Sequence, residues 1–120
     1  MGAEIANTTG IIVTVKITGR LTESELAAIQ NRTAEIIRKQ GKVRILVLAE
    51  SFEGWQSSGE WNDFAFQKQN DPYIEKMAIV DDTQWEDLAL VFAAKGLRPF
   101  PIEYFAPDEL AKARAWLTNP

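Results

Sequence analysis

One short run of the sequence, Val43 to Ala49, limits the folds open to this chain more than any other feature. The run reads VRILVLA and is almost continuously apolar. A strand with this pattern is typical of the interior of a parallel sheet, where helices cover both faces. We therefore expect a sheet that carries this strand in its middle.

A strand and a helix are predicted before this run. Residues 10–19 alternate branched and polar side chains, which predicts a strand with Ile11, Val13, Val15 and Ile17 on one face. Ile5 is assigned to an earlier strand that pairs with it through an NTTG turn. Residues 21–41 have helical apolar spacing, a Thr22–Glu25 capping box and a closing Gly41.

Helix and strand patterns continue to alternate after the run. A loop is predicted from Glu50, and it enters a helix near Ser57 or Ser58. The remaining predicted elements are a strand at 77–80, a helix at 84–95 with Thr83 and Glu86 as capping box, a strand at 102–105 and a helix at 107–117.

The order of these elements, ββαβαβαβα, predicts the fold class. Strands separated by helices require right-handed crossovers, so the later strands should be parallel. We expect an α/β fold with a single mixed, largely parallel sheet and helices packed against it. The length of 120 residues suits one domain over 1–120.

Several classes of enzyme are disfavoured by composition. The chain has no histidine and no cysteine, so a Ser-His-Asp triad, a thiol nucleophile and the usual zinc ligands are absent. Neither G-x-x-x-x-G-K-[ST] nor G-x-G-x-x-G occurs. We expect a protein that is not an enzyme and that uses no cofactor and no metal.

Net charge bears on the choice of partner. The formal charge is −4 and the sequence pI is about 4.8, so the average surface repels phosphate backbones and nucleic acid is not expected as a partner. A small basic group, Arg38, Lys39, Lys42 and Arg44, spans a predicted helix end, where cations favour the helix dipole without any other role.

Carboxylates follow two of the predicted strands. The residues are Glu50, Glu53, Glu60, Asp63, Asp81 and Asp82. If the strands are parallel, these groups gather at one sheet edge, where an acid/base pair or a Mg²⁺ site could form. Their spacing matches no metal loop, and acidic groups near helix N-termini are favourable in themselves, so we interpret them as structural.

Aromatic residues concentrate after the same strands. The candidate ligand-binding residues are Phe52, Trp55, Trp61, Phe64, Trp85 and Phe92. Open α/β sheets bind ligands at the carboxyl ends of their strands, which predicts an aromatic cleft there. The alternative is that several of these rings only fill the core.

Sequence motifs along nearly the whole chain resemble the SpoIIAA-like protein family. The motifs are V-x-V-x-I-T-G-R-L-T, K-V-R-I-L-V, F-E-G-W-x(5)-W-x-D-F, K-M-A-I-V-D-D and Y-F-x-x-x-E-L-x-x-A-x-x-W-L. The resemblance implies a fold similar to STAS domains, the class of the anti-sigma-factor antagonist, and related to CRAL-TRIO domains. It also implies that the protein binds a small apolar or lipid-like ligand and contacts membranes reversibly, with no established reaction.

A regulatory role is the alternative that the resemblance offers. In the antagonist, a serine in a D-S-S-G segment is phosphorylated to switch partner binding. Here the segment 56–59 reads Q-S-S-G, so Ser57 and Ser58 are candidate phosphorylation sites, although N-capping explains serine there equally well. A protein partner and a second copy of the chain are the further candidate partners.

The expected location is the cytoplasm of a bacterium, with peripheral membrane contact as an added expectation. The lack of cysteine gives no reason to expect an oxidising compartment. The first ten residues do not resemble a signal peptide, and the longest apolar stretch is too short to cross a bilayer.

Overall fold

A computed structural model describes residues 3–55, 71–87, 90 and 99–119. In this part of the chain, five strands form one sheet in the order β1-β2-β3-β4-β5. Their bounds are Ala3–Thr9 for β1, Ile12–Leu21 for β2, Val43–Trp55 for β3, Ile74–Val80 for β4 and Ile102–Phe105 for β5. The predicted mixed sheet is confirmed, because β1 is antiparallel to β2 and all the other neighbours are parallel.

The full predicted order, ββαβαβαβα, is not confirmed. The helix predicted from Ser57 or Ser58 lies outside the described residues, and so does most of the helix predicted at 84–95. Residues 86, 87 and 90 are helical. Two short 3-10 turns, η1 at Asp71–Tyr73 and η2 at Thr83–Trp85, precede and follow β4.

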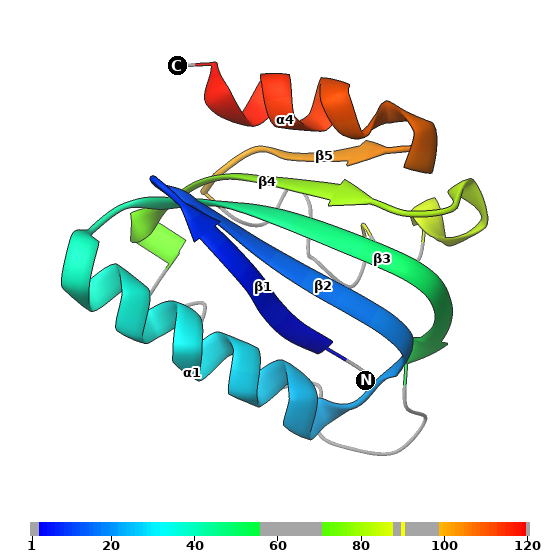
Figure 1. Cartoon of the computed structure of the whole chain (residues 1–120), viewed down its shortest axis with the longest axis horizontal. Coiled ribbons are helices and arrows are strands. Elements are labelled where there is room, and N and C mark those ends of the chain that lie inside the picture. Colours follow the sequence, from blue (N-terminus) through cyan, green and yellow to red (C-terminus); the bar gives the residue numbers. More distant parts are fainter. Residues whose placement is uncertain (1–2, 56–70, 88–89, 91–98, 120) are drawn as a thin grey trace.

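Helix α1, Glu23–Gln40, covers one face of the sheet (Figure 1). It begins as predicted: Thr22 Oγ1 accepts a hydrogen bond from the Glu25 amide at 3.2 Å, and Glu25 Oε1 accepts one from the Thr22 amide at 3.0 Å. It ends at Gly41, whose φ of 90° favours glycine. Local capping residues therefore define both ends of this helix.

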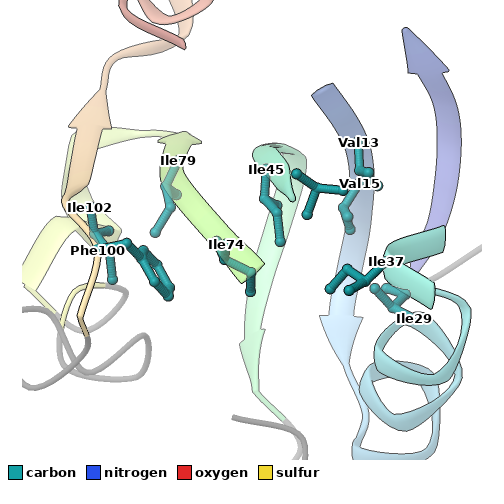
Figure 2. Packing of buried hydrophobic residues seen from close by; sticks show 10 residues of the cluster. Val13, Val15, Ile29, Ile37, Ile45, Ile74, Ile79, Phe100 and Ile102 are labelled. Atoms are coloured by element: carbon teal, nitrogen blue, oxygen red, sulfur yellow. The ribbon is translucent and has the colours of Figure 1, made fainter. Parts of the chain in front are cut away.

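The main core lies between α1 and the sheet. Ile29 and Ile37 of α1 pack with the inner residues of β2, Val13 and Val15, in a cluster that extends to Phe100 beside β5 (Figure 2). Ile11 does not take part. It lies in the turn before β2 and is 42% exposed, so the prediction that it shares a strand face with Val13 and Val15 is wrong.

The opposite face of the sheet is covered by helix α4, Leu110–Thr118, which follows the 3-10 turn η3, Pro107–Glu109 (Figure 1). Ala113 and Leu117 of α4 pack in a second cluster with Leu46 of β3 and Ala78 of β4. Val43 and Ile45 belong to the first cluster and Leu46 to the second. The expectation that both faces of this strand are covered is therefore met.

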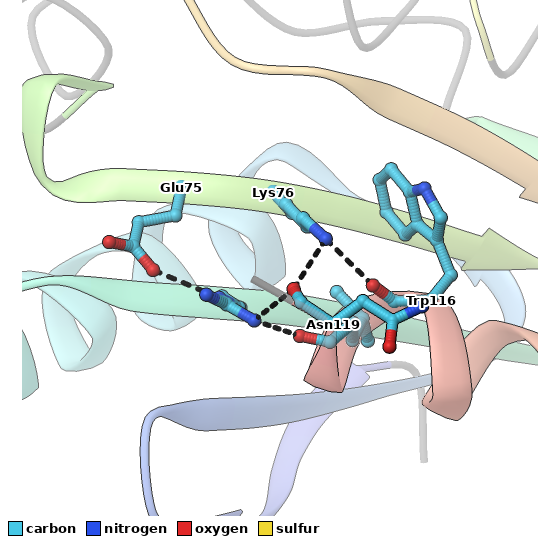
Figure 3. Close-up of polar contacts among 6 residues, drawn as sticks. Glu75, Lys76, Trp116 and Asn119 are labelled. Carbon is cyan, nitrogen blue, oxygen red and sulfur yellow. Dashed lines mark hydrogen bonds and ion pairs between the residues drawn. The ribbon is translucent and has the colours of Figure 1, made fainter.

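Two cations from neighbouring strands hold the end of α4 (Figure 3). Lys76 Nζ donates to the carbonyl oxygens of Trp116 and Asn119 at 2.8 and 2.7 Å, and lies 4.9 Å from the centre of the Trp116 ring.

Arg44 is the second cation. It donates to the carbonyls of Leu117 and Asn119 and pairs with Glu75 at 2.9 Å. Helix ends leave carbonyls unsatisfied, and these cations supply the missing donors. Arg44 thus stabilises the end of α4, whereas the sequence associated it with the end of the helix before it.

Strand β3 is longer than predicted. The segment from Glu50 to Trp55, predicted as a loop, continues the strand because β2 extends beside it. Thr18 pairs with Glu50 and Leu21 with Trp55, with irregular register between them. Pairing with a distant strand is the physical reason for the difference, since a sequence window around Glu50 does not contain β2. The F-E-G-W motif is therefore part of the sheet.

Candidate functional site

Two predicted aromatic residues meet at the carboxyl end of the sheet, on the right in Figure 1. Phe52 lies near the end of β3, and Trp85 ends η2, which follows β4. Their ring centroids are 5.1 Å apart and the planes make an angle of 73°, an edge-to-face arrangement. Such pairs are favourable beyond the apolar area they bury. Both side chains are half-buried, so the pair is not part of the deep core.

Gly54 provides the surface on which Trp85 lies. Its φ is 96°, and a Cβ added there would lie 3.4 Å from Trp85 Cη2 and 3.6 Å from Cζ3. A methyl group would already be in van der Waals contact with the indole, so a larger side chain would collide with it. The glycine of the F-E-G-W motif therefore allows both the backbone conformation and the close approach of the ring.

Backbone hydrogen bonds fix the turn that presents Trp85. The Asp82 carbonyl accepts from the Trp85 amide at 3.1 Å and from the Tyr104 hydroxyl at 2.6 Å. Asp82 Oδ1 also accepts from the Gln84 amide at 3.1 Å. Asp82 thus ties η2, which ends at Trp85, to Tyr104 of β5.

Asp81 and Tyr104 lie in an acidic environment beside this turn. Asp81 is buried, and its Oδ1 accepts from the Asp82 amide at 2.7 Å. Burial raises the pKa of Asp81, and the charge of Asp82 adds to the effect. The pKa of Tyr104 is also raised, mainly by burial and further by the negative charges of Asp81, Glu86 and Asp82. The Tyr104 hydroxyl therefore keeps its proton and remains a donor.

These carboxylates have structural roles in the described part of the chain. Asp81 and Asp82 accept backbone hydrogen bonds, and Glu50 lies 3.7 Å from Lys16 Nζ in an exposed ion pair. No group of three or more carboxylates that could hold a metal ion is found among the residues described. The two described carboxylates that follow β4 thus accept hydrogen bonds from the backbone of the turn that leads to Trp85.

The other predicted site residues are placed only in part. Trp55 ends β3 and its backbone pairs with Leu21, but nothing is described of its side chain. The remaining predicted residues, Trp61, Phe64, Phe92, Ser57 and Ser58, lie outside the described residues. The ligand-binding role of the whole set stays a prediction.

Sequence reasoning missed two residues of this site, Gly54 and Tyr104. Gly54 gave only a weak signal: glycine inside a strand often marks a close approach, but this segment was predicted as a loop, where glycine is common. Tyr104 had no such signal. Its bond to Asp82 depends on β5 lying next to β4, which only the fold reveals.

Comparison with known proteins identifies the family. A family model described as SpoIIAA-like matches residues 12–118. The chain belongs to the SpoIIAA-like family. No curated protein matches it. A solved structure with the SpoIIAA-like fold, an uncharacterised DUF3478-family protein from Shewanella loihica PV-4, is similar with a TM-score of 0.74 and 16% identity, over 97% of this chain and 94% of that one.

The SpoIIAA-like fold supports, in general terms, a non-catalytic regulatory module with protein partners. The similar structure shows the fold alone, because its identity to this chain is low. In the described part of the chain, no helix is both long and apolar enough to cross a membrane.

Proposed function

We propose that this SpoIIAA-like protein binds a small apolar or amphipathic, lipid-like ligand at the carboxyl end of its sheet. The observation that carries the proposal is the edge-to-face pair of Phe52 and Trp85, with the indole lying against Gly54. The predicted residues Trp55, Trp61, Phe64 and Phe92 are proposed to contribute to the same site.

The position of the pair supports binding more than core packing. Among the residues that the structure describes, neither ring belongs to the buried clusters on the two faces of the sheet, and both side chains are half-buried. Burying apolar surface contributes about 25 cal/mol for each Å², so a ligand that covers two such rings gains affinity without any reaction. The carboxyl ends of the strands are also the place where open α/β sheets bind ligands.

The neighbouring polar groups support a ligand with one polar end. Tyr104 and the turn at Asp82 lie beside Trp85, so hydrogen-bonding groups border the apolar rings on one side. Binding sites commonly combine an apolar lining with a few fixed polar groups. Reversible contact with a membrane, from which such a ligand would be taken up, forms part of the proposal.

Native mass spectrometry of the purified full chain tests the proposal. We expect a fraction of the protein to carry a non-covalent lipid-sized adduct, and we expect added oleate to displace or fill it and to change the tryptophan fluorescence. A protein that emerges empty and does not respond to oleate contradicts the proposal. A Trp85→Leu variant, which keeps an apolar side chain, should bind oleate more weakly.

A further inference from the structure

The two edges of the sheet differ in how well they are protected from pairing with another chain. Strand order places β1 at one edge and β5 at the other (Figure 1). β5 has only four residues, and it lies between Pro101 and Pro107, which carry no amide hydrogen. Short edge strands and prolines are common devices against edge-to-edge association. The β5 edge is therefore a poor template for a further strand.

Strand β1 lacks these two devices. It extends over seven residues, Ala3–Thr9, contains no proline and has one charged residue, Glu4. Among the strands that the structure describes, it pairs only with β2. One side of β1 thus carries a row of amide and carbonyl groups to which no described strand is paired. Such a row is a template for another extended chain.

The described helices leave this edge accessible. Helix α1 contacts both β1 and β2, so it lies over the pair of strands and does not extend far past β1. On the opposite face, α4 contacts mainly β3, β4 and β5. Glu4, Ala6 and Thr8 of β1 are exposed. An approaching strand therefore meets only small or flexible side chains at this edge.

A second copy of the chain fits the β1 edge. Two β1 strands related by a two-fold axis perpendicular to the sheet run antiparallel, so each supplies the same backbone groups to the other. A bulge between Ile5 and Asn7 bends β1 at Ala6. An axis at Ala6 lets both strands bend at the same point. Glu4 then stands opposite Thr8 of the second copy, so the only charges of the two strands do not face each other.

Helix α1 adds a second layer to this contact. The two-fold axis places both copies of α1 on the same face of the joined sheet. Because neighbouring strands are about 4.8 Å apart and α1 lies over the β1–β2 pair, the two helices come to lie about 10 Å apart. Packed helices are usually 8 to 10 Å apart, on the order of this spacing. The helices therefore support pairing through β1 and do not block it.

We propose that two copies of the chain associate through β1 and join their sheets into one. A single strand pair is only marginally stable in water, so the dimer should dissociate on dilution. The two-fold axis reverses the strand direction, which places the aromatic sites of the two copies at opposite ends of the joined sheet. Association through β1 is therefore independent of the proposed ligand binding and leaves both sites open.

Sedimentation velocity tests the association. The full chain should show a monomer–dimer equilibrium that shifts towards the dimer as the concentration rises. Ala6→Lys places two like charges opposite each other at the axis and should weaken the dimer by about tenfold or more. Ala111→Lys, the same substitution at an exposed alanine of α4, should leave the equilibrium unchanged. A wild type that stays monomeric at millimolar concentration overturns the proposal.

Single-cysteine variants test the position of the axis, because the chain has no cysteine of its own. Under mild oxidation, Ala6→Cys should form a disulfide-linked dimer, since its two copies meet at the axis, whereas Ala111→Cys should not. An equal mixture of Glu4→Cys and Thr8→Cys chains should give mainly the mixed dimer. If Ala6→Cys cross-links no better than Ala111→Cys, pairing through β1 is overturned, and this result does not depend on whether Ala6→Lys folds.

Discussion

The indole of Trp85 lies against the backbone of Gly54, two residues after its ring partner Phe52 in the same strand. Two residues of β3 thus position Trp85: Phe52 contacts its indole with a ring, and Gly54 contacts it with backbone. The turn after β4 brings that tryptophan to β3, since Asp82 accepts from Trp85 and Tyr104. The aromatic site is therefore built from three strands that are separated in sequence.

Substitution of Gly54 tests this contact. Gly54→Ala should cost about 1–2 kcal/mol of unfolding free energy, because its φ of 96° disfavours any side chain. Gly54→Val should cost more and should displace the indole, since the methyl position already lies 3.4 Å from it. Denaturant unfolding and near-UV circular dichroism measure the two effects.

Gly10 provides the matched control, because it lies in the turn between β1 and β2, away from the aromatic pair. Its φ is also positive, at 59°, but no described atom lies within 4 Å of its Cβ position. Gly10→Val should therefore show the backbone cost without a change in the tryptophan signal. Equal behaviour of the two valine variants would argue against Gly54 as the surface that positions Trp85.

Local signals made much of the fold predictable. The Thr22–Glu25 capping box and Gly41 define α1 within a few neighbouring residues, and the apolar run from Val43 marks the strand that is covered on both faces. The extension of β3 to Trp55 was not predictable in this way, because it depends on pairing with β2. The same difference between local and distant signals holds for the site. The sequence indicated Phe52 and Trp85 because they are aromatic, but it did not indicate their contact or the roles of Gly54 and Tyr104.

Tyr104 is expected to position Trp85 through the turn at Asp82. Tyr104→Phe removes the 2.6 Å hydrogen bond to the Asp82 carbonyl and should cost about 1 kcal/mol of stability. Oleate affinity should fall as well, because the turn that carries Trp85 loses one of its bonds. A variant that is less stable but binds oleate unchanged would show that Tyr104 is purely structural. Isothermal titration and thermal unfolding of the same samples make the distinction.

Asp81 should make stability depend on pH. Burial raises its pKa above the ordinary value of 3.8, so between that value and the raised pKa the folded state binds more protons than the unfolded state. Its contribution is then fully present at low pH and is lost as the pH rises through the raised pKa. Asp81→Asn keeps an oxygen that can accept from the Asp82 amide and should remove this loss. The unfolding free energy of the variant, relative to that of the wild type, should therefore increase from acidic to neutral pH. A difference that stays constant with pH would contradict the assignment.

Lys76 should stabilise the docking of α4. Lys76→Met keeps the apolar stem but loses two hydrogen bonds to carbonyls and the contact with the Trp116 ring. We expect a loss of about 1–3 kcal/mol and faster amide exchange in α4. Lys112→Met, which breaks only an exposed pair with Glu109 at the end of η3, should change neither quantity measurably. Similar effects of the two substitutions would mean that the carbonyl contacts of Lys76 contribute little.

Oleate titration of ring variants tests the central claim most directly. Wild type, Phe52→Leu, Trp85→Leu and Trp116→Leu would be compared by isothermal calorimetry after each has been shown to fold. Trp116 is the control, because it packs on the α4 face with Phe105, at 6.1 Å between ring centroids, and away from the proposed site. We expect saturable binding that weakens about tenfold in the Phe52 and Trp85 variants and stays unchanged in the Trp116 variant. Absence of binding in the wild type, or equal affinity in all four proteins, would contradict a ligand site at the Phe52–Trp85 pair.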